Sequence, residues 1–473
     1  MKWFVWILVG VLCMGGALVA AVETVDVVPR RLAPYVAMRA SGHQAAIEHV
    51  GSLVADALLA VDRGPRMPAL FGVTASAHLP AAPGDDSRAS ASVVLVGSTE
   101  EALQAIAHAS PGDAITFLPG TYRFNGSYIA ASRSGSREAP ITVRSVQLGS
   151  TILEFNMVEG FLVSAPYWTF ENLVIRGACA AHSSCEHAFH VVGGAHHFVA
   201  RHNDIVDFNA HFKINGSHQR FPDSGVIEAN RIRNESVRDT GNPVTLIDLV
   251  AASHWRIRGN RISDFAKGQS DGISYGAFAK GGGSDNRFEQ NVVLCEERLI
   301  HVAGQRVGLS LGGGGTGRSA CRDGRCITEQ DQGVVAANLI AFCSDDGIYL
   351  NRAAMSSVSH NTLVDTGGIT VRFAESSADV EGNLVDGVVR ARAGAALHAH
   401  DNVTTDLAWL YLGVHPVRRL FADALALDLR WRSDPPRRVT VEALPPDLCG
   451  PARSTHPAYG AFDAFERCTV QRN

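Results

Sequence analysis

The sequence predicts an all-β protein of the right-handed parallel β-helix class, with a capping helix and a further helical segment on its N-terminal side. A short pattern, apolar–x–Asn–x–apolar, recurs along most of the chain, as expected when one structural unit is stacked many times. The units are rich in β-forming residues, are separated by Gly, and contain no long stretch of helical periodicity. The 473 residues include 46 Gly, which suits a solenoid with many tight corners and a large core.

The repeat is marked by one Asn in each unit. These are Asn172, Asn203, Asn230, Asn260, Asn291, Asn338, Asn361, Asn383 and Asn402. Asn tolerates left-handed backbone geometry at a tight bend. On rungs about 4.8 Å apart, stacked amides can hydrogen-bond to one another. We therefore predict a structural Asn ladder. Its irregular spacing indicates loops of different length, the longest being an insertion at residues 312–332.

The N-terminus is predicted to be a targeting segment. Lys2 precedes an apolar run over residues 3–22, which matches a signal peptide with a small-residue cleavage site. The run is also about 20 residues long, the length of a single membrane span, so an N-terminal anchor stays an alternative. Both alternatives predict an exported protein, either periplasmic or secreted, whose only contact with a membrane would be that anchor.

Three further regions follow residues 1–22. Residues 23–92 are predicted to be a helical segment and a linker rich in Pro, Ala and Ser. The β-helix is predicted over residues 93–410, with a helix capped by Ser98 over its open end. Residues 411–473 form a C-terminal tail or cap. The helical segment is predicted from apolar residues at steps of three or four: Ile47, Val50, Val54, Leu58 and Val61.

The cysteines indicate disulfides. Nine Cys minus Cys13 leaves eight, an even number that suits four bridges in an oxidising compartment. There is no CxxC pair and no zinc-finger spacing, so zinc ligation by these cysteines is not expected. Three pairs lie close in sequence and the fourth could join neighbouring coils: Cys179 with Cys185, Cys321 with Cys326, Cys449 with Cys468, and Cys295 with Cys343.

Composition narrows the class of partner. The net charge is −5 and charged residues make up 19% of the chain, so the positive field of a nucleic-acid-binding protein is missing. A local basic groove for an acidic sugar remains compatible with this balance.

Several stretches resemble the pectate-lyase-like right-handed parallel β-helix superfamily, and within it chondroitinase B and the related alginate lyases. They are GDAITFLPGTY, APITVRSV and WTFENLVIRG. The segment GAFAKGGGSDNRFEQNVV is similar to that family's Lys strand and Asn corner, and it places the Lys at Lys280. The resemblance implies a Lys base, an assisting Arg one rung further on, and calcium to neutralise the sugar carboxylate. At the expected Arg position this chain reads GLSLGGGGTG.

Elimination on a uronate polymer needs a neutralised carboxylate, a base and an acid. Lys280 and Lys213 are the candidate bases, and His190 and His211 are candidates from a cluster of eight histidines. Asp248 and Asp271 are weak candidate calcium ligands. The candidate residues for binding sugar carboxylates are Arg231, Arg256, Arg287 and Arg306. The alternatives are a solvated surface role for the lysines, structural hydrogen bonding for the histidines, and a solubilising role for the arginines.

The predicted function is that of an exported polysaccharide lyase acting on an acidic, uronate-containing glycan. One alternative is a hydrolase or epimerase on the same scaffold, for which the adjacent Asp345 and Asp346 are the candidate carboxylate pair. The other is a non-catalytic glycan-binding or structural β-helix, since one fold hosts many functions.

Overall fold

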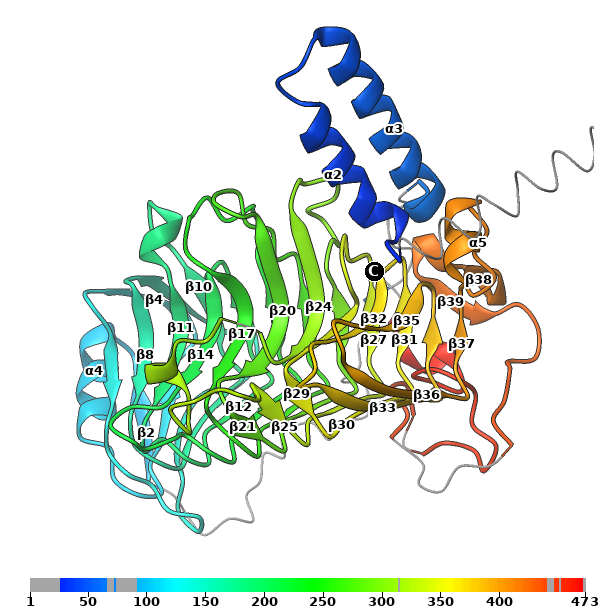
Figure 1. Ribbon diagram of the computed structural model, residues 1–473. Helices are drawn as coiled ribbons and strands as arrows, with labels where there is room; N and C mark the ends of the chain where they lie inside the picture. Colours follow the sequence, from blue (N-terminus) through cyan, green and yellow to red (C-terminus); the bar gives the residue numbers. More distant parts are fainter. Residues whose placement is uncertain are drawn as a thin grey trace, which may run out of the picture.

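The computed structural model describes residues 26–65, 72–73, 92–313, 315–439, 446–450 and 452–470. The predicted targeting segment and most of the linker lie outside these ranges. No helix within them is long and apolar enough to cross a bilayer. Three long sheets, all parallel, wind around one core, so the predicted right-handed parallel β-helix is confirmed (Figure 1).

Each coil contributes one strand to each of three sheets, here called sheets I, II and III. Within the described residues, sheet I consists of β2 (Val93–Val96), β3 (Ala114–Phe117), β6 (Ile141–Ser145), β9 (Trp168–Glu171), β12 (Val199–Arg201), β15 (Val226–Glu228), β18 (Arg256–Arg258), β22 (Arg287–Glu289), β26 (Val334–Ala336), β30 (Ser356–Ser359), β33 (Ser377–Glu381) and β36 (Ala396–His400).

Sheet II follows sheet I in every coil. It consists of β4 (Gly120–Asn125), β7 (Thr151–Asn156), β10 (Val174–Gly177), β13 (Asp204–Val206), β16 (Arg231–Arg233), β19 (Arg261–Ser263), β23 (Val292–Leu294), β27 (Leu339–Ala341), β31 (Thr362–Val364), β34 (Leu384–Val385) and β37 (Val403–Thr404).

Sheet III completes the coil and has the longest strands. It consists of β5 (Ile129–Ala131), β8 (Glu159–Val163), β11 (His187–Val192), β14 (Ala210–Asn215), β17 (Val244–Val250), β20 (Ile273–Lys280), β24 (Gln305–Leu311), β28 (Ile348–Asn351), β32 (Gly368–Arg372) and β35 (Val388–Arg392). The short strands β21 (Gly283–Ser284), β25 (Gln330–Asp331) and β29 (Ala353–Ala354) form a further parallel ladder at a corner.

The Asn ladder runs along the turn between sheets I and II and is buried. From Asn203 to Asn402, each amide donates to the side-chain oxygen of the next Asn at 2.9–3.0 Å. The left-handed geometry belongs to the residue before each Asn, such as His202 at φ 55°. Asn172 was wrongly assigned to the ladder: with φ 58° it occupies that left-handed position, and the backbone of Leu173 contacts Asn203 instead.

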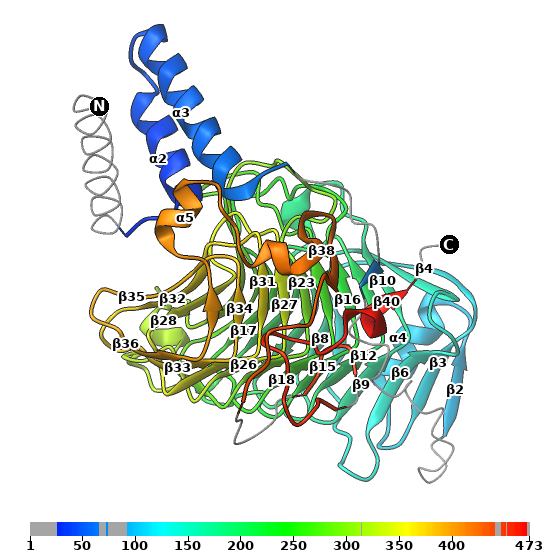
Figure 2. The same ribbon diagram turned by 90° about the vertical axis from the view of Figure 1, so that its right-hand side faces the viewer.

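Helices cover the open end and one side of the solenoid. The predicted capping helix is α4 (Thr99–Ala107), whose N-cap Ser98 accepts from the Glu101 amide at 3.1 Å. The N-terminal helical segment forms a hairpin of α2 (Pro29–Ala40) and α3 (Ala45–Arg63) that stands out from the far half of the solenoid (Figures 1 and 2).

Buried ion pairs hold the base of this hairpin. Arg30 contacts Asp62 of α3 and Asp365 of the solenoid, the latter at 3.0 Å. Arg63 contacts Asp365 at 3.1 Å and Glu296 at 3.3 Å. The hairpin is therefore part of the same folded unit as the β-helix.

The C-terminal tail covers the outer face of the later rungs of sheet II (Figure 2). Its elements are α5 (Leu407–Tyr411), β38 (Phe421–Asp423) and β39 (Asp428–Trp431), while β40 (Thr469–Val470) pairs with β1 (Gly72–Val73). Phe421, Leu429 and Phe462 pack with Val292 and Leu339 of sheet II. This face of the solenoid is therefore closed to a polymer.

All four expected disulfides are present: Cys179–Cys185, Cys295–Cys343, Cys321–Cys326 and Cys449–Cys468.

Candidate active site

The outer face of sheet III carries one row of polar side chains on three consecutive rungs. In register, His190 of β11 lies beside Lys213 of β14, which lies beside Asp248 of β17. Lys213 Nζ donates to Asp248 Oδ2 at 2.6 Å. The side chain of Lys213 is 25% exposed and that of Asp248 is 8% exposed. The row therefore presents a half-buried ion pair to the outside.

Two inward residues in succession create this arrangement. In β11 both Ala188 and Phe189 are fully buried, so the usual alternation of a strand is interrupted. His187 and His190 consequently face the same side, with their ring centroids 5.2 Å apart. Glu159 of β8 pairs in register with His187 and its Oε1 lies 3.0 Å from His190 Nδ1.

The same interruption in β14 explains the position of His211. It precedes Phe212 as Ala188 precedes Phe189, so it occupies the first of the two inward positions. It has no exposed surface, and its Nε2 lies 2.9 Å from the Arg233 carbonyl oxygen. Burial lowers the pKa of His211 to about 3. The structure therefore does not bring His211 to the outward row, whereas His190 is part of it.

His187 and Asn215 complete the cluster around His190. Burial, together with the neighbouring charges of His190 and Lys213, lowers the pKa of His187 to about 4, so it is uncharged at neutral pH. Asn215 Oδ1 lies 2.9 Å from His190 Nε2. Glu159 and Asn215 do not stand out in the sequence. Aligning successive coils on the stacked Phe161, Phe189 and Phe212 would have found them.

Lys280 also faces outward, because Ala277 and Ala279 are the inward residues of β20. It pairs in register with Val250, in the column next to the one containing Lys213. Its Nζ lies 4.4 Å from the centroid of the Phe278 ring. Asp248 thus partners Lys213 rather than Lys280, and the two lysines lie two rungs apart.

The four candidate arginines do not form one row. Arg231 is on sheet II, while Arg256 and Arg287 are register neighbours on sheet I. Arg306 is 2% exposed and contacts Glu296 at 2.7 Å, so it is not available to a substrate. These arginines therefore lie on different faces of the solenoid, because the strands of one coil belong to different sheets.

The candidate calcium ligands do not converge. Asp248 is engaged by Lys213, and Asp271 lies in a loop and contacts Lys267 at 2.8 Å. Within the described residues, neither belongs to a group of three metal-ligating side chains; the one such group is Glu159, His187 and His190. Calcium requires six to eight oxygen ligands, so the residues present do not fit a calcium ion.

The adjacent Asp345 and Asp346 are covered by the helical hairpin. Arg31 of α2 contacts Asp345 at 3.0 Å and Asp346 at 3.5 Å, and both carboxylates are almost fully buried. Burial and the charge of Asp346 raise the pKa of Asp345 to about 6. A polymer cannot reach this pair while the hairpin is docked.

A hollow of about 550 Å³ opens at the carboxyl ends of the first strands of sheet III. Ser164 directly follows β8 and Gly194 lies two residues after β11, so the hollow adjoins the strands that carry Glu159 and His190. Its lining also includes His196, Arg220 and Phe221. An exposed guanidinium, Arg220, and the imidazole of His196 are thus available near the carboxyl ends of these strands.

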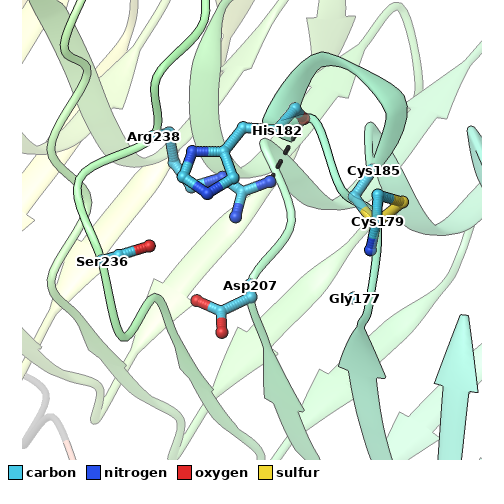
Figure 3. A pocket seen from close by; sticks show the side chains of 7 residues that line it. All are labelled: Gly177, Cys179, His182, Cys185, Asp207, Ser236 and Arg238. Atoms are coloured by element: carbon cyan, nitrogen blue, oxygen red, sulfur yellow. Dashed lines mark hydrogen bonds between the residues drawn. A yellow bond between two sulfur atoms is a disulfide. The ribbon is translucent and has the colours of Figure 1, made fainter. Parts of the chain in front are cut away.

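A second, smaller pocket lies between the end of β10 and the start of β11 (Figure 3). Its volume is about 70 Å³, room for roughly two water molecules at ~30 Å³ each. The Cys179–Cys185 disulfide, Asp207 and Arg238 line it, and Arg238 Nη2 donates to the His182 carbonyl oxygen at 3.2 Å. A sugar ring does not fit there.

No family model matches the chain, and no curated protein matches its sequence. Among solved structures, pectate lyase Pel9A is similar, with 14% identity and a TM-score of 0.49 over 79% of this chain and 97% of that one. A rhamnogalacturonan lyase shows 15% identity and a TM-score of 0.47 over 66% and 87%. An alginate lyase from a Paenibacillus species shows 16% identity and a TM-score of 0.35 over 66% and 95%. Likeness at this level leaves the activity to be argued from the residues of the site.

Proposed function

We propose that this protein is an exported polysaccharide lyase that cleaves a uronate-containing glycan by β-elimination, with Lys213 as the base. The observation that carries the proposal is the Lys213–Asp248 pair, joined at 2.6 Å on the outward row of sheet III. Lys213 has a quarter of its side chain exposed, so its Nζ can be reached from outside.

The pair supplies both the base and the acid. When a polymer covers the row, transfer of a proton from Lys213 to Asp248 along their 2.6 Å hydrogen bond gives a neutral amine beside a carboxylic acid. Lys213 Nζ then takes the proton from C5 of the uronate. The electron pair forms the C4–C5 double bond as the bond from C4 to the glycosidic oxygen breaks. Asp248 gives its proton to that oxygen, which leaves the resting ammonium and carboxylate.

Positive and aromatic groups beside the row favour an acidic glycan. Arg220 is exposed at the hollow, and a guanidinium binds carboxylates through two parallel hydrogen bonds. The Arg322 guanidinium lies over the Phe221 ring, 4.4 Å from its centroid, and adds a second positive group at this end of the row. The four disulfides support an oxidising, exported location.

The test is the ultraviolet absorbance of unsaturated product, measured with purified protein on alginate, pectate, chondroitin sulfate and dermatan sulfate. Lys213→Met is the decisive variant, and Lys280→Met is its matched control because it removes an outward Lys of the same sheet. We expect product on one substrate, lost in Lys213→Met and retained in Lys280→Met.

Other outcomes would overturn the proposal. Loss only in Lys280→Met would move the base to that residue. Release of reducing ends without unsaturation would indicate a hydrolase. No product of either kind would indicate a glycan-binding or structural β-helix.

A further inference from the structure

Three ligand-type side chains converge on the outer face of sheet III, on the two rungs before the one that carries Lys213. One ligand atom each from Glu159, His187 and His190 lie within 4.8 Å of one another. All three residues are partly exposed, although the Nδ1 atoms of both histidines are buried. This group is separate from the Lys213–Asp248 pair, and its two imidazoles and one carboxylate do not fit calcium.

The hydrogen bonds fix the tautomer of His190. Asn215 Nδ2 donates to the Gly216 carbonyl oxygen at 3.0 Å, so the amide oxygen is the atom that faces His190 Nε2 at 2.9 Å. An amide oxygen only accepts, hence Nε2 carries a hydrogen. The other ring nitrogen, Nδ1, lies 3.0 Å from Glu159 Oε1, and a carboxylate oxygen only accepts. Two acceptors at this distance repel unless a proton or a cation lies between them.

His187 adds a second unsatisfied nitrogen. Within the described residues, His187 Nδ1 is buried and lacks a hydrogen-bond partner, and the contact of buried His190 Nδ1 is the Glu159 carboxylate. Buried polar atoms are normally paired, so an unpaired imidazole nitrogen in a group with a second imidazole and a carboxylate is consistent with a ligand. The Ala188–Phe189 interruption described above is what turns both rings to this side.

We propose that Glu159, His187 and His190 bind one divalent cation of the zinc class, with an open coordination position toward solvent. Two imidazole nitrogens and one carboxylate oxygen are a ligand set that zinc prefers, and three protein ligands leave a fourth position free. Asn215 is a positioning residue that holds His190 in the ligating tautomer. Calcium is a poor fit, because it requires oxygen ligands in larger number.

The role of the cation rests on the proposed function. His190 is the register neighbour of Lys213, so a sugar above Lys213 can place its carboxylate at the open position. The cation would then neutralise the carboxylate, which is the requirement for making the C5 proton acidic.

The test uses Zn²⁺ alone, titrated against the full-length protein with a chromogenic chelator as competitor, without any substrate. We expect one ion per chain with a Kd on the order of 1 μM or below, unaffected by excess Ca²⁺. Glu159→Gln and His190→Ala should each weaken binding at least ~100-fold, and Asn215→Leu about 10- to 100-fold, since it removes only the orienting contact. His196→Ala, a histidine outside the group, is the matched control.

Co²⁺ provides a second readout, because a site with mixed nitrogen and oxygen ligands gives it a visible absorption band that should disappear in Glu159→Gln. Thermal melting confirms that each variant is folded. Equal loss in His196→Ala, or binding unchanged in Asn215→Leu, would overturn the site, as would the absence of binding, which would leave a proton between His190 and Glu159.

The two proposals can fail separately. Zinc binding without unsaturated product would refute the lyase alone, and unsaturated product from protein that binds no zinc would refute the metal site alone.

Discussion

Replacing Lys213 by Met separates the chemical role of its amine from its structural role. The substitution keeps a side chain of similar length but leaves the Asp248 carboxylate, 8% exposed, without its cation. Removing one partner of a fully buried pair costs 3–5 kcal/mol, and an exposed pair contributes at most ~1 kcal/mol. Since Lys213 is a quarter exposed, we expect a loss of about 2 kcal/mol in the free energy of unfolding.

Adding Asp248→Asn to this variant removes the unpaired charge. The double variant should therefore recover to within about 1 kcal/mol of the wild type in urea denaturation. Its rate of unsaturated-product formation should stay at least ~100-fold low, because both the base and the acid are gone. Recovery of activity together with stability would refute the chemical role, and wild-type stability in Lys213→Met would refute the half-buried ion pair.

Three further predictions concern the scaffold. His211 is uncharged in the folded state, with its pKa lowered to about 3, but takes up a proton near pH 6.5 when the chain is unfolded. The free energy of unfolding should therefore be full above pH 6.5 and fall toward pH 3 by up to ~1.4 kcal/mol per pH unit. In urea denaturation, His211→Phe should show a shallower dependence of this free energy on pH. Replacing Cys295 and Cys343 by Ala opens a loop spanning 48 residues, which should cost about 4 kcal/mol in urea denaturation. Asn291→Leu breaks the buried ladder hydrogen bonds to both neighbouring Asn residues. It should lower the free energy of unfolding, measured in urea, by about 3 kcal/mol, whereas an unchanged free energy would contradict the ladder.

The repeat pattern was sufficient to predict the fold. The spacing of the Asn residues locates the coils because the ladder requires an amide at one fixed corner of each rung. Asn172 was misplaced by one residue because Asn suits both the ladder position and the left-handed position before it. Which of these two positions joins the buried ladder depends on contacts with the neighbouring coils. A pattern along one chain does not contain those contacts.

The site was predictable only in part. Lys213, His190 and Asp248 were candidates because charged and imidazole groups stand out in apolar strands. Their grouping was not predictable, since it depends on the two successive inward residues that shift the alternation in β11 and β14. That shift also moved His211 into the core.

The position of the site along the solenoid follows from what covers sheet III. Beyond β17, the outward row continues through Ser310, Thr370 and Arg390, and all three are buried. Thr370 donates to Asp346 at 3.0 Å, and Asp346 is held by Arg31 of the hairpin. The hairpin therefore closes the Asp345–Asp346 pair to a polymer. A polymer that binds this sheet meets the open rungs from β8 to β17, where the Lys213–Asp248 pair and the Glu159, His187 and His190 group lie side by side.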